Sequence, residues 1–148
     1  MKLYVAYGSN LNLDQMSHRC PDALVVGTGV IEGYALKYRG FRKSAVATII
    51  PEEGRSVPVL VWSISPRDEE NLDIYEGYPR LYYKKNINVM LDNGRKVSAM
   101  VYIMSDDAFP GTPSNAYVHT ILSGYLQNHM NPSPLFDSLD ENEKEVLS

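Results

Sequence analysis

The sequence is poor in the residues that build disulfide frameworks and metal sites. Its 148 residues include one cysteine, Cys20, and three histidines, His18, His119 and His129. A single cysteine excludes an intramolecular disulfide framework and a cysteine-rich zinc site, and it fits a reducing, cytoplasmic compartment. The histidines show neither H-x-x-x-H nor H-E-x-x-H spacing. We therefore expect no metal site and no cofactor.

Long hydrophobic runs and basic clusters are also missing. The N-terminal apolar run is about five residues long, shorter than a signal-peptide core, and no stretch approaches the ~20 residues of a membrane-spanning helix. The formal net charge is −4, and the longest basic segment, Arg39 to Lys43, is short. Neither nucleic acid nor a membrane is therefore expected as a partner. Composition leaves the oligomeric state open.

The chain does have the ordinary composition of one globular domain. Hydrophobic residues make up 44% of it and charged residues 22%, which at this length is enough to bury one core. Beyond Pro132 and Pro134 the composition becomes acidic. We predict one domain over residues 1–130 and an acidic C-terminal extension over residues 131–148, present as a short peripheral helix or a loose tail.

The first ten residues, MKLYVAYGSN, predict a strand that ends in a binding loop. The segment from Leu3 to Tyr7 has strand period and strand-type residues, and it breaks abruptly into Gly8, Ser9 and Asn10. A helix should follow, because the next residues have the spacing of a capping box. Free amides at such a turn form a cradle for a carboxylate or a phosphate. An ordinary structural turn is the alternative.

The middle of the chain predicts further strands. Residues 21–40 indicate one or two long strands with glycines at 27, 29 and 33, which favour a curved or closed sheet. The glycine spacing is one residue too long for a dinucleotide-binding fingerprint. Residues 44–51 and 57–64 predict two strands that pair antiparallel around a polar hairpin loop at 52–55. Residues 81–91 and 95–104 flank Asp92-Asn93-Gly94 and predict a second hairpin.

One acid stands at an unfavourable place in the segment LDIYEGYPRLYY, residues 72–83. Ser65 and Pro66 begin the preceding helix and Gly77 ends it, so Glu76 lies in the last helical turn. The helix dipole and burial among tyrosines would both raise the pKa of this carboxyl group. A raised pKa suits general acid/base catalysis. A solvated acid before a C-capping glycine is the alternative.

A second long helix is predicted from Ser114 to about Asn128. Tyr117, Ile121 and Tyr125 recur there at helical spacing, which places all three on one inward stripe. Tyr117 could then reach the binding loop. Ordinary core packing is the alternative.

Taken together and in this order, the segments resemble the γ-glutamylcyclotransferase-like (AIG2-like) family. The resemblance covers roughly residues 3 to 128 and rests on YGSN at 7–10, ATI at 47–49, VPVLVWSI at 57–64, LDIYEGYP at 72–79, and a late helix with Tyr117 and Gly124-Tyr125. It implies an α+β fold in which a mixed, mostly antiparallel curved sheet closes into a small β-barrel with peripheral helices. An ordered set of motifs is more specific than any single one.

The resemblance also implies an activity and its site. Such an enzyme cleaves a γ-glutamyl amide by intramolecular attack of the α-amine, giving 5-oxoproline and a free amine or amino acid. By position, Tyr7, Gly8, Ser9 and Asn10 look like the substrate-binding loop. Glu76 looks like the catalytic acid/base. The glutathione-specific branch of this fold carries a different residue after YGS, so the asparagine argues against that branch.

Two tyrosines look like further substrate-binding residues. Tyr117 resembles the one that reaches the pocket from the late helix, and Tyr82 the one that follows the acid, although the adjacent Tyr83 leaves the second assignment open. Two alternative functions stay open as well. One is a cyclotransferase specific for γ-glutamyl amines, and the other is a non-catalytic carboxylate-binding or interaction protein on the same fold. Retention of both the YGSN loop and the acid favours catalysis.

Overall fold

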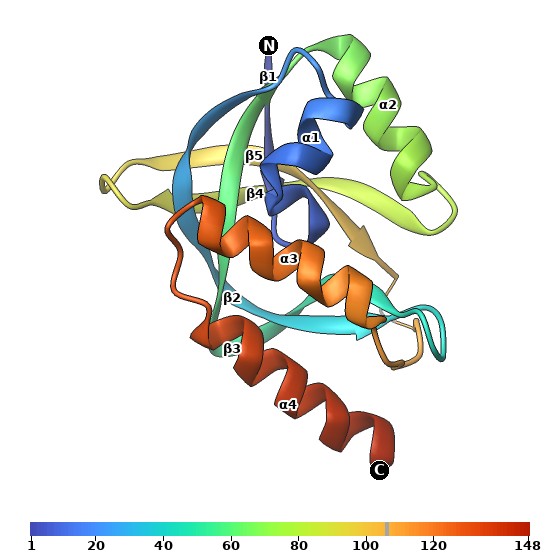
Figure 1. The fold of residues 1–148 in the computed structure, drawn as a ribbon. Coiled ribbons are helices and arrows are strands. Elements are labelled where there is room, and N and C mark those ends of the chain that lie inside the picture. Colours follow the sequence, from blue (N-terminus) through green and yellow to red (C-terminus); the bar gives the residue numbers. More distant parts are fainter. Residues whose placement is uncertain (106) are drawn as a thin grey trace.

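The computed structural model describes residues 1–105 and 107–148, and in it a closed barrel of strands carries helices on its outside (Figure 1). The barrel order is β1-β3-β2-β4-β5, where β1 and β5 are parallel and the other pairs are antiparallel. This confirms the predicted α+β class and the mixed, mostly antiparallel barrel. In chain order the elements are β1 (Lys2–Ala6), the 3-10 helix η1 (Ser9–Leu11), α1 (Leu13–Arg19), β2 (Leu24–Arg39), β3 (Val46–Ile64), α2 (Pro66–Glu76), β4 (Tyr82–Leu91), β5 (Lys96–Met104), α3 (Asn115–Gln127) and α4 (Ser133–Leu147).

Strands β2 and β3 form one long antiparallel ribbon, which corrects the prediction for residues 44–64. The two halves of β3 do not pair with each other, because both pair with β2: Leu36 faces Ile49, and Ile31 faces Val57. Between these pairs, residues 52–55 bulge out of the ladder opposite Gly33, whose φ is +81°. Glycine adopts a positive φ at little cost. The polar residues and the glycine that predict a hairpin turn at 52–55 therefore form a bulge instead.

The second half of β3 is covered on both faces. Residues 59–62 are all buried, whereas a strand with one solvated face would alternate. The inner side chains fill the barrel, and η1 covers the outer side, where the Trp62 indole N–H donates to the Asn10 carbonyl at 3.1 Å. The YGSN segment is therefore fixed to the barrel wall.

Helix α2 begins and ends where the sequence predicts. Ser65 forms a capping box with Asp68, and Pro66 occupies the first turn. Gly77 adopts the left-handed conformation, with φ of +68°, and ends the helix. The carboxylate of Glu76 is thereby held in the last turn. The predicted hairpin at residues 92–94 is also present, since β4 and β5 pair on either side of it.

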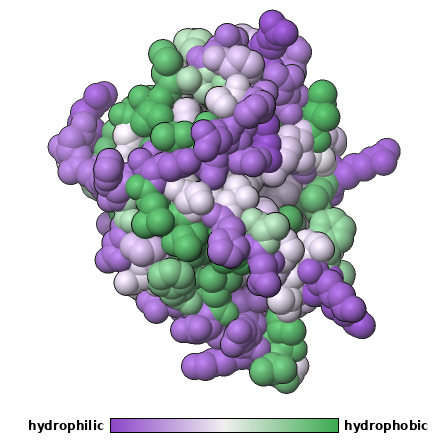
Figure 2. Space-filling model, in the orientation of Figure 1, coloured by the Kyte–Doolittle hydropathy of each residue, from purple (hydrophilic) through white to green (hydrophobic). Residues whose placement is uncertain are grey.

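Helix α3 packs against η1, and α4 packs against β2. Helix α3 lies where it is predicted, and the Ser114 side chain caps its start by accepting from the Tyr117 amide. The segment after residue 131 is a helix rather than a loose tail: Leu135 of α4 is fully buried, and the hydroxyls of Ser138 and Tyr38 lie 2.8 Å apart. Among the helices of the described residues, none has both the length and the apolar character that crossing a membrane requires. On the face drawn in Figure 2, hydrophobic patches are interrupted by hydrophilic side chains.

Candidate active site

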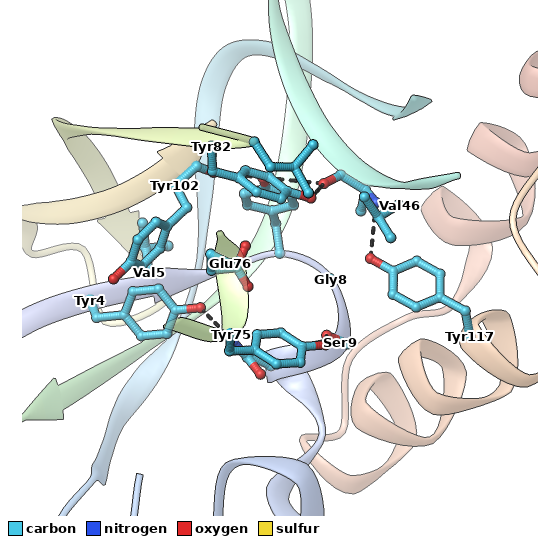
Figure 3. Close-up of a pocket in the computed structure, with 14 residues that line it drawn as sticks. Tyr4, Val5, Gly8, Ser9, Val46, Tyr75, Glu76, Tyr82, Tyr102 and Tyr117 are labelled. Carbon is cyan, nitrogen blue, oxygen red and sulfur yellow. Dashed lines mark hydrogen bonds between the residues drawn. The ribbon is translucent and has the colours of Figure 1, made fainter. Parts of the chain in front are cut away.

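One cavity contains every residue that the sequence analysis assigns to the site (Figure 3). Its volume is about 180 Å³. Seven elements or their connections contribute to its wall, so it forms only when the barrel closes. The lining residues are Tyr4, Val5, Tyr7, Gly8, Ser9, Asn10, Val46, Ala47, Tyr75, Glu76, Leu81, Tyr82, Tyr102 and Tyr117.

All four residues of the YGSN segment line this cavity. In η1 the Leu11 amide donates to the Gly8 carbonyl and the Asn12 amide to the Ser9 carbonyl, each at 3.0 Å. The amides of Ser9 and Asn10 therefore have no acceptor within the turn. At Gly8 a Cβ atom would lie 3.1 Å from the Ala47 Cβ and 3.4 Å from the Tyr117 hydroxyl, so glycine keeps this end of the cavity open.

Glu76 lies in the centre of the cavity, among the surrounding tyrosines (Figure 3). Burial raises the pKa of its carboxyl group to about 7, and the guanidinium of Arg19 opposes the rise. The predicted direction of the shift is thus confirmed, with burial as its main cause. Near pH 7 such a group exchanges a proton readily in both directions.

The two adjacent tyrosines of β4 differ in position. Tyr82 is buried and lines the cavity, whereas Tyr83 is 41% exposed. Neighbouring side chains of a strand point to opposite faces, so only one of the two can face the cavity. The structure therefore places Tyr82, and not Tyr83, at the candidate site.

Two tyrosine hydroxyls hold the backbone of Ala47. Tyr82 donates to the Ala47 carbonyl at 2.6 Å, and the Ala47 amide donates to the Tyr117 hydroxyl at 2.9 Å. The Tyr117 hydroxyl accepts this bond, so its own proton is available to a ligand in the cavity. Burial raises the pKa of both phenols, which keeps them neutral donors.

The remaining loop tyrosine has a structural contact. The Tyr7 hydroxyl donates to the Tyr102 carbonyl at 2.6 Å, which ties the end of β1 to β5. Burial raises the pKa of the Tyr7 phenol. Tyr7 therefore lines the cavity with its ring while its hydroxyl fixes the barrel wall.

Sequence reasoning missed Tyr4, Tyr75, Tyr102 and Arg19. Tyr75 had a usable signal, because it precedes Glu76 in the same helical turn. Tyr4 and Tyr102 lie in strands, where tyrosine is common for packing reasons alone. Arg19 reaches the site only through the fold. Within residues 1–105 and 107–148, no three His, Cys, Asp or Glu side chains gather into a ligand set for a metal ion.

Comparison with known proteins identifies the family. The family model described as Gamma-glutamyl cyclotransferase, AIG2-like, matches residues 4–125. The chain belongs to this family. It is 27% identical over 135 residues to the Gamma-glutamylcyclotransferase of Mus musculus and 26% identical to that of Homo sapiens, covering 85% of this chain and 71% of each relative.

Solved structures agree with the family membership. One described as Gamma-glutamyl cyclotransferase superimposes with a TM-score of 0.80 at 24% identity, covering 97% of this chain and 85% of that one. A structure of an uncharacterized protein from Homo sapiens gives a TM-score of 0.78 at 25% identity, with the same coverage. The γ-glutamyl cyclotransferase family fold therefore extends over nearly the whole chain, α4 included.

Proposed function

We propose that this chain is a γ-glutamylcyclotransferase-type enzyme that converts a γ-glutamyl amide into 5-oxoproline and a free amine or amino acid. The observation that carries the proposal is the half-buried carboxyl group of Glu76, which has a pKa of about 7 and shares one cavity with the YGSN loop in a chain of this family. A carboxyl group in that state is uncommon unless it exchanges protons during a reaction.

The reaction needs few catalytic groups because the substrate contains its own nucleophile. Its α-amine is tethered to the γ-carbonyl that it attacks, so holding the glutamyl group in a folded conformation supplies a high effective molarity. The α-nitrogen forms a bond to the γ-carbon, and the amide bond to the leaving nitrogen breaks. Glu76 removes a proton from the α-ammonium group, which cannot attack while charged, and returns a proton to the leaving nitrogen.

The YGSN loop holds the negative charges of the substrate. The amides of Gly8, Ser9 and Asn10 are placed to bind the α-carboxylate or the oxyanion that develops on the γ-carbonyl. A crystal soaked with 5-oxoproline or glutamate should show a carboxylate within hydrogen-bond reach of these amides. Density elsewhere in the cavity, with the loop empty, would contradict this role.

A panel of γ-glutamyl compounds tests the function directly. Each γ-glutamyl amino acid in the panel should be paired with a γ-glutamyl amine whose leaving amine carries the same side chain. Glutathione should be included, and release of 5-oxoproline is the readout. Release from the amines alone would identify an amine-specific enzyme. Binding of 5-oxoproline without turnover of any compound would identify a non-catalytic carboxylate-binding protein. Glu76→Gln is the control for contaminating activity.

A further inference from the structure

Arg19, the last residue of α1, joins three parts of the molecule. Its Nη1 donates to Asn10 Oδ1 at 2.6 Å and its Nη2 to Gln15 Oε1 at 2.5 Å. Its guanidinium carbon lies 3.5 Å from the centroid of the Tyr75 ring. Its carbonyl oxygen accepts from Asn71 Nδ2 at 3.0 Å. The binding loop, α1 and α2 therefore meet at this one half-buried side chain.

The contacts of Arg19 form a closed ring beside the cavity, which runs through Tyr75, Ser9 and Asn10. The hydroxyls of Tyr75 and Ser9 lie 3.1 Å apart, and both residues border the cavity in Figure 3. Asn10, which accepts from Arg19, also donates to the Tyr4 hydroxyl at 2.9 Å. Tyr75 is adjacent to Glu76 in the chain. Any movement of the guanidinium would therefore move the binding loop and the helical turn of the acid relative to each other.

We propose that Arg19 is a positioning residue that fixes the Gly8–Asn10 loop against the helical turn carrying Glu76. The inference rests on the proposed function, because it explains how the substrate-binding and proton-transfer parts keep one geometry. The planar guanidinium forms two directed hydrogen bonds and stacks on an aromatic ring at the same time. A lysine ammonium has the charge but lacks both the fork and the flat face.

The charge of Arg19 has a second consequence for the acid. The titratable groups around Glu76 come from six elements or their ends. They are Tyr4 and Tyr7 of β1 and its end, Arg19 of α1, Tyr75 of α2, Tyr82 of β4, Tyr102 of β5 and Tyr117 of α3, whereas β3 and η1 contribute uncharged residues. Arg19 is the cation among them, and it opposes the effect of burial on the pKa of Glu76. The acids Glu69 and Asp73, also on α2, are bound to Lys84 at 2.9 and 3.0 Å.

The test compares Arg19→Gln with Arg19→Lys, and Arg67→Gln serves as the matched control because it removes an exposed cation from α2. In Arg19→Gln we expect kcat/KM to fall roughly 10- to 100-fold and the acidic limb of its pH profile to move to higher pH. In Arg19→Lys the rate should fall by a similar factor while the acidic limb stays near that of the parent. Arg67→Gln should leave both unchanged. Melting temperatures show whether each variant is folded.

A second readout works without turnover and separates this proposal from the proposed function. The carboxyl carbon of Glu76, assigned in ¹³C NMR spectra by its loss in Glu76→Gln, should titrate at higher pH in Arg19→Gln. In Arg19→Lys the backbone amide signals of Ser9 and Asn10 should shift while the carboxyl titration does not. If the parent protein released no 5-oxoproline, the proposed function would be wrong, but the NMR titration would still test the positioning role of Arg19. A fully active Arg19→Lys, or an Arg19→Gln with unchanged rate and titration, would overturn the positioning role.

Discussion

Two glutamates of α2, two helical turns apart, show opposite behaviour. At the start of the helix, Glu69 binds Lys2 at 2.8 Å and Lys84 at 2.9 Å. Burial works to raise its pKa, but these two lysines outweigh burial and hold the pKa below its usual value. At the other end, Glu76 has only the more distant influence of Arg19, so burial prevails and raises its pKa to about 7. The number of cations at bonding distance, and not the residue type, therefore decides the direction in which the pKa of each glutamate shifts.

The difference separates a region of α2 that stabilises the fold from the end that carries the proposed catalytic acid. Asp73, between the two glutamates, also binds Lys84 at 3.0 Å and accepts from the Tyr102 hydroxyl at 2.6 Å. These bonds attach the first turns of α2 to β4 and β5. The last turn then projects its carboxyl group into the cavity without an ion-pair partner at bonding distance among the described residues. The ion pairs of Glu69 and Asp73 hold the earlier turns of α2 in place, while Glu76 in the last turn carries a negative charge that burial disfavours.

The largest effect should come from removing the acid at the reactive end. Glu76→Gln keeps the shape and removes the titrating group, so turnover should fall by roughly 10² to 10⁴, about 3 to 5 kcal/mol of barrier. Steady-state release of 5-oxoproline measures this. Glu69→Gln is the matched control on the same helix and should remain active. Parent-level turnover in Glu76→Gln would end the proposed mechanism.

Removing one hydroxyl opposite the acid should have the next largest effect. Tyr117→Phe keeps the ring and removes a donor to the substrate, so turnover should fall roughly 10- to 100-fold. It also leaves the Ala47 amide without its acceptor, and we expect a loss of about 1 kcal/mol in stability. Kinetics and chemical denaturation measure the two effects separately. An unchanged rate would assign this tyrosine to core packing.

The pH dependence of stability sharpens the comparison further. The pKa of Glu76 rises from 4.5 to about 7 on folding, so the folded protein binds the proton more tightly. This contribution is favourable at low pH and is lost as pH rises from about 4.5 to 7. The loss should be roughly 1 to 3 kcal/mol after allowance for partial exposure. Urea denaturation at pH 5 and pH 8 should show it in the parent, and Glu76→Gln should not show it.

The smallest effect should come from the stabilising end. Lys84→Met removes ion pairs to Glu69 and Asp73, and because these pairs are partly solvated we expect a loss of about 0.5 to 1 kcal/mol. Since the lysines lower the pKa of Glu69, its contribution is present at neutral pH and disappears as pH falls through the folded value. Denaturation at pH 7 and pH 3 measures this. A large loss of turnover in this variant would contradict the separation of the two regions.

Local signals predicted the parts of the site that depend on short stretches of chain. The end of β1 shortly before Gly8, the caps of α2 at Ser65 and Gly77, and the hairpin at residues 92–94 each follow from a few neighbouring residues. Glu76 could be singled out for the same reason, because it directly precedes the capping glycine in the sequence. Wherever one turn of backbone decides the geometry, the sequence is sufficient.

Longer-range features could not be predicted in this way. Residues 52–55 carry the same polar and glycine signals in a hairpin turn as in a bulge, and only the pairing of both halves of β3 with β2 selects the bulge. Period-two alternation shows that Tyr82 and Tyr83 face opposite sides of β4. Only the fold decides which side borders the cavity, and there Tyr82 lines the cavity while Tyr83 is exposed.

The sequence by itself determined the family of this protein and singled out the candidate loop and the candidate acid, because these are properties of short, ordered motifs. Only the tertiary structure decided the environment of the acid: the tyrosines that surround it, the Ala47 backbone that orients two of them, and the placement of Arg19 over the Tyr75 ring. Those contacts join residues far apart in the chain, and the desolvation that raises the pKa of Glu76 exists only once the barrel has closed around it.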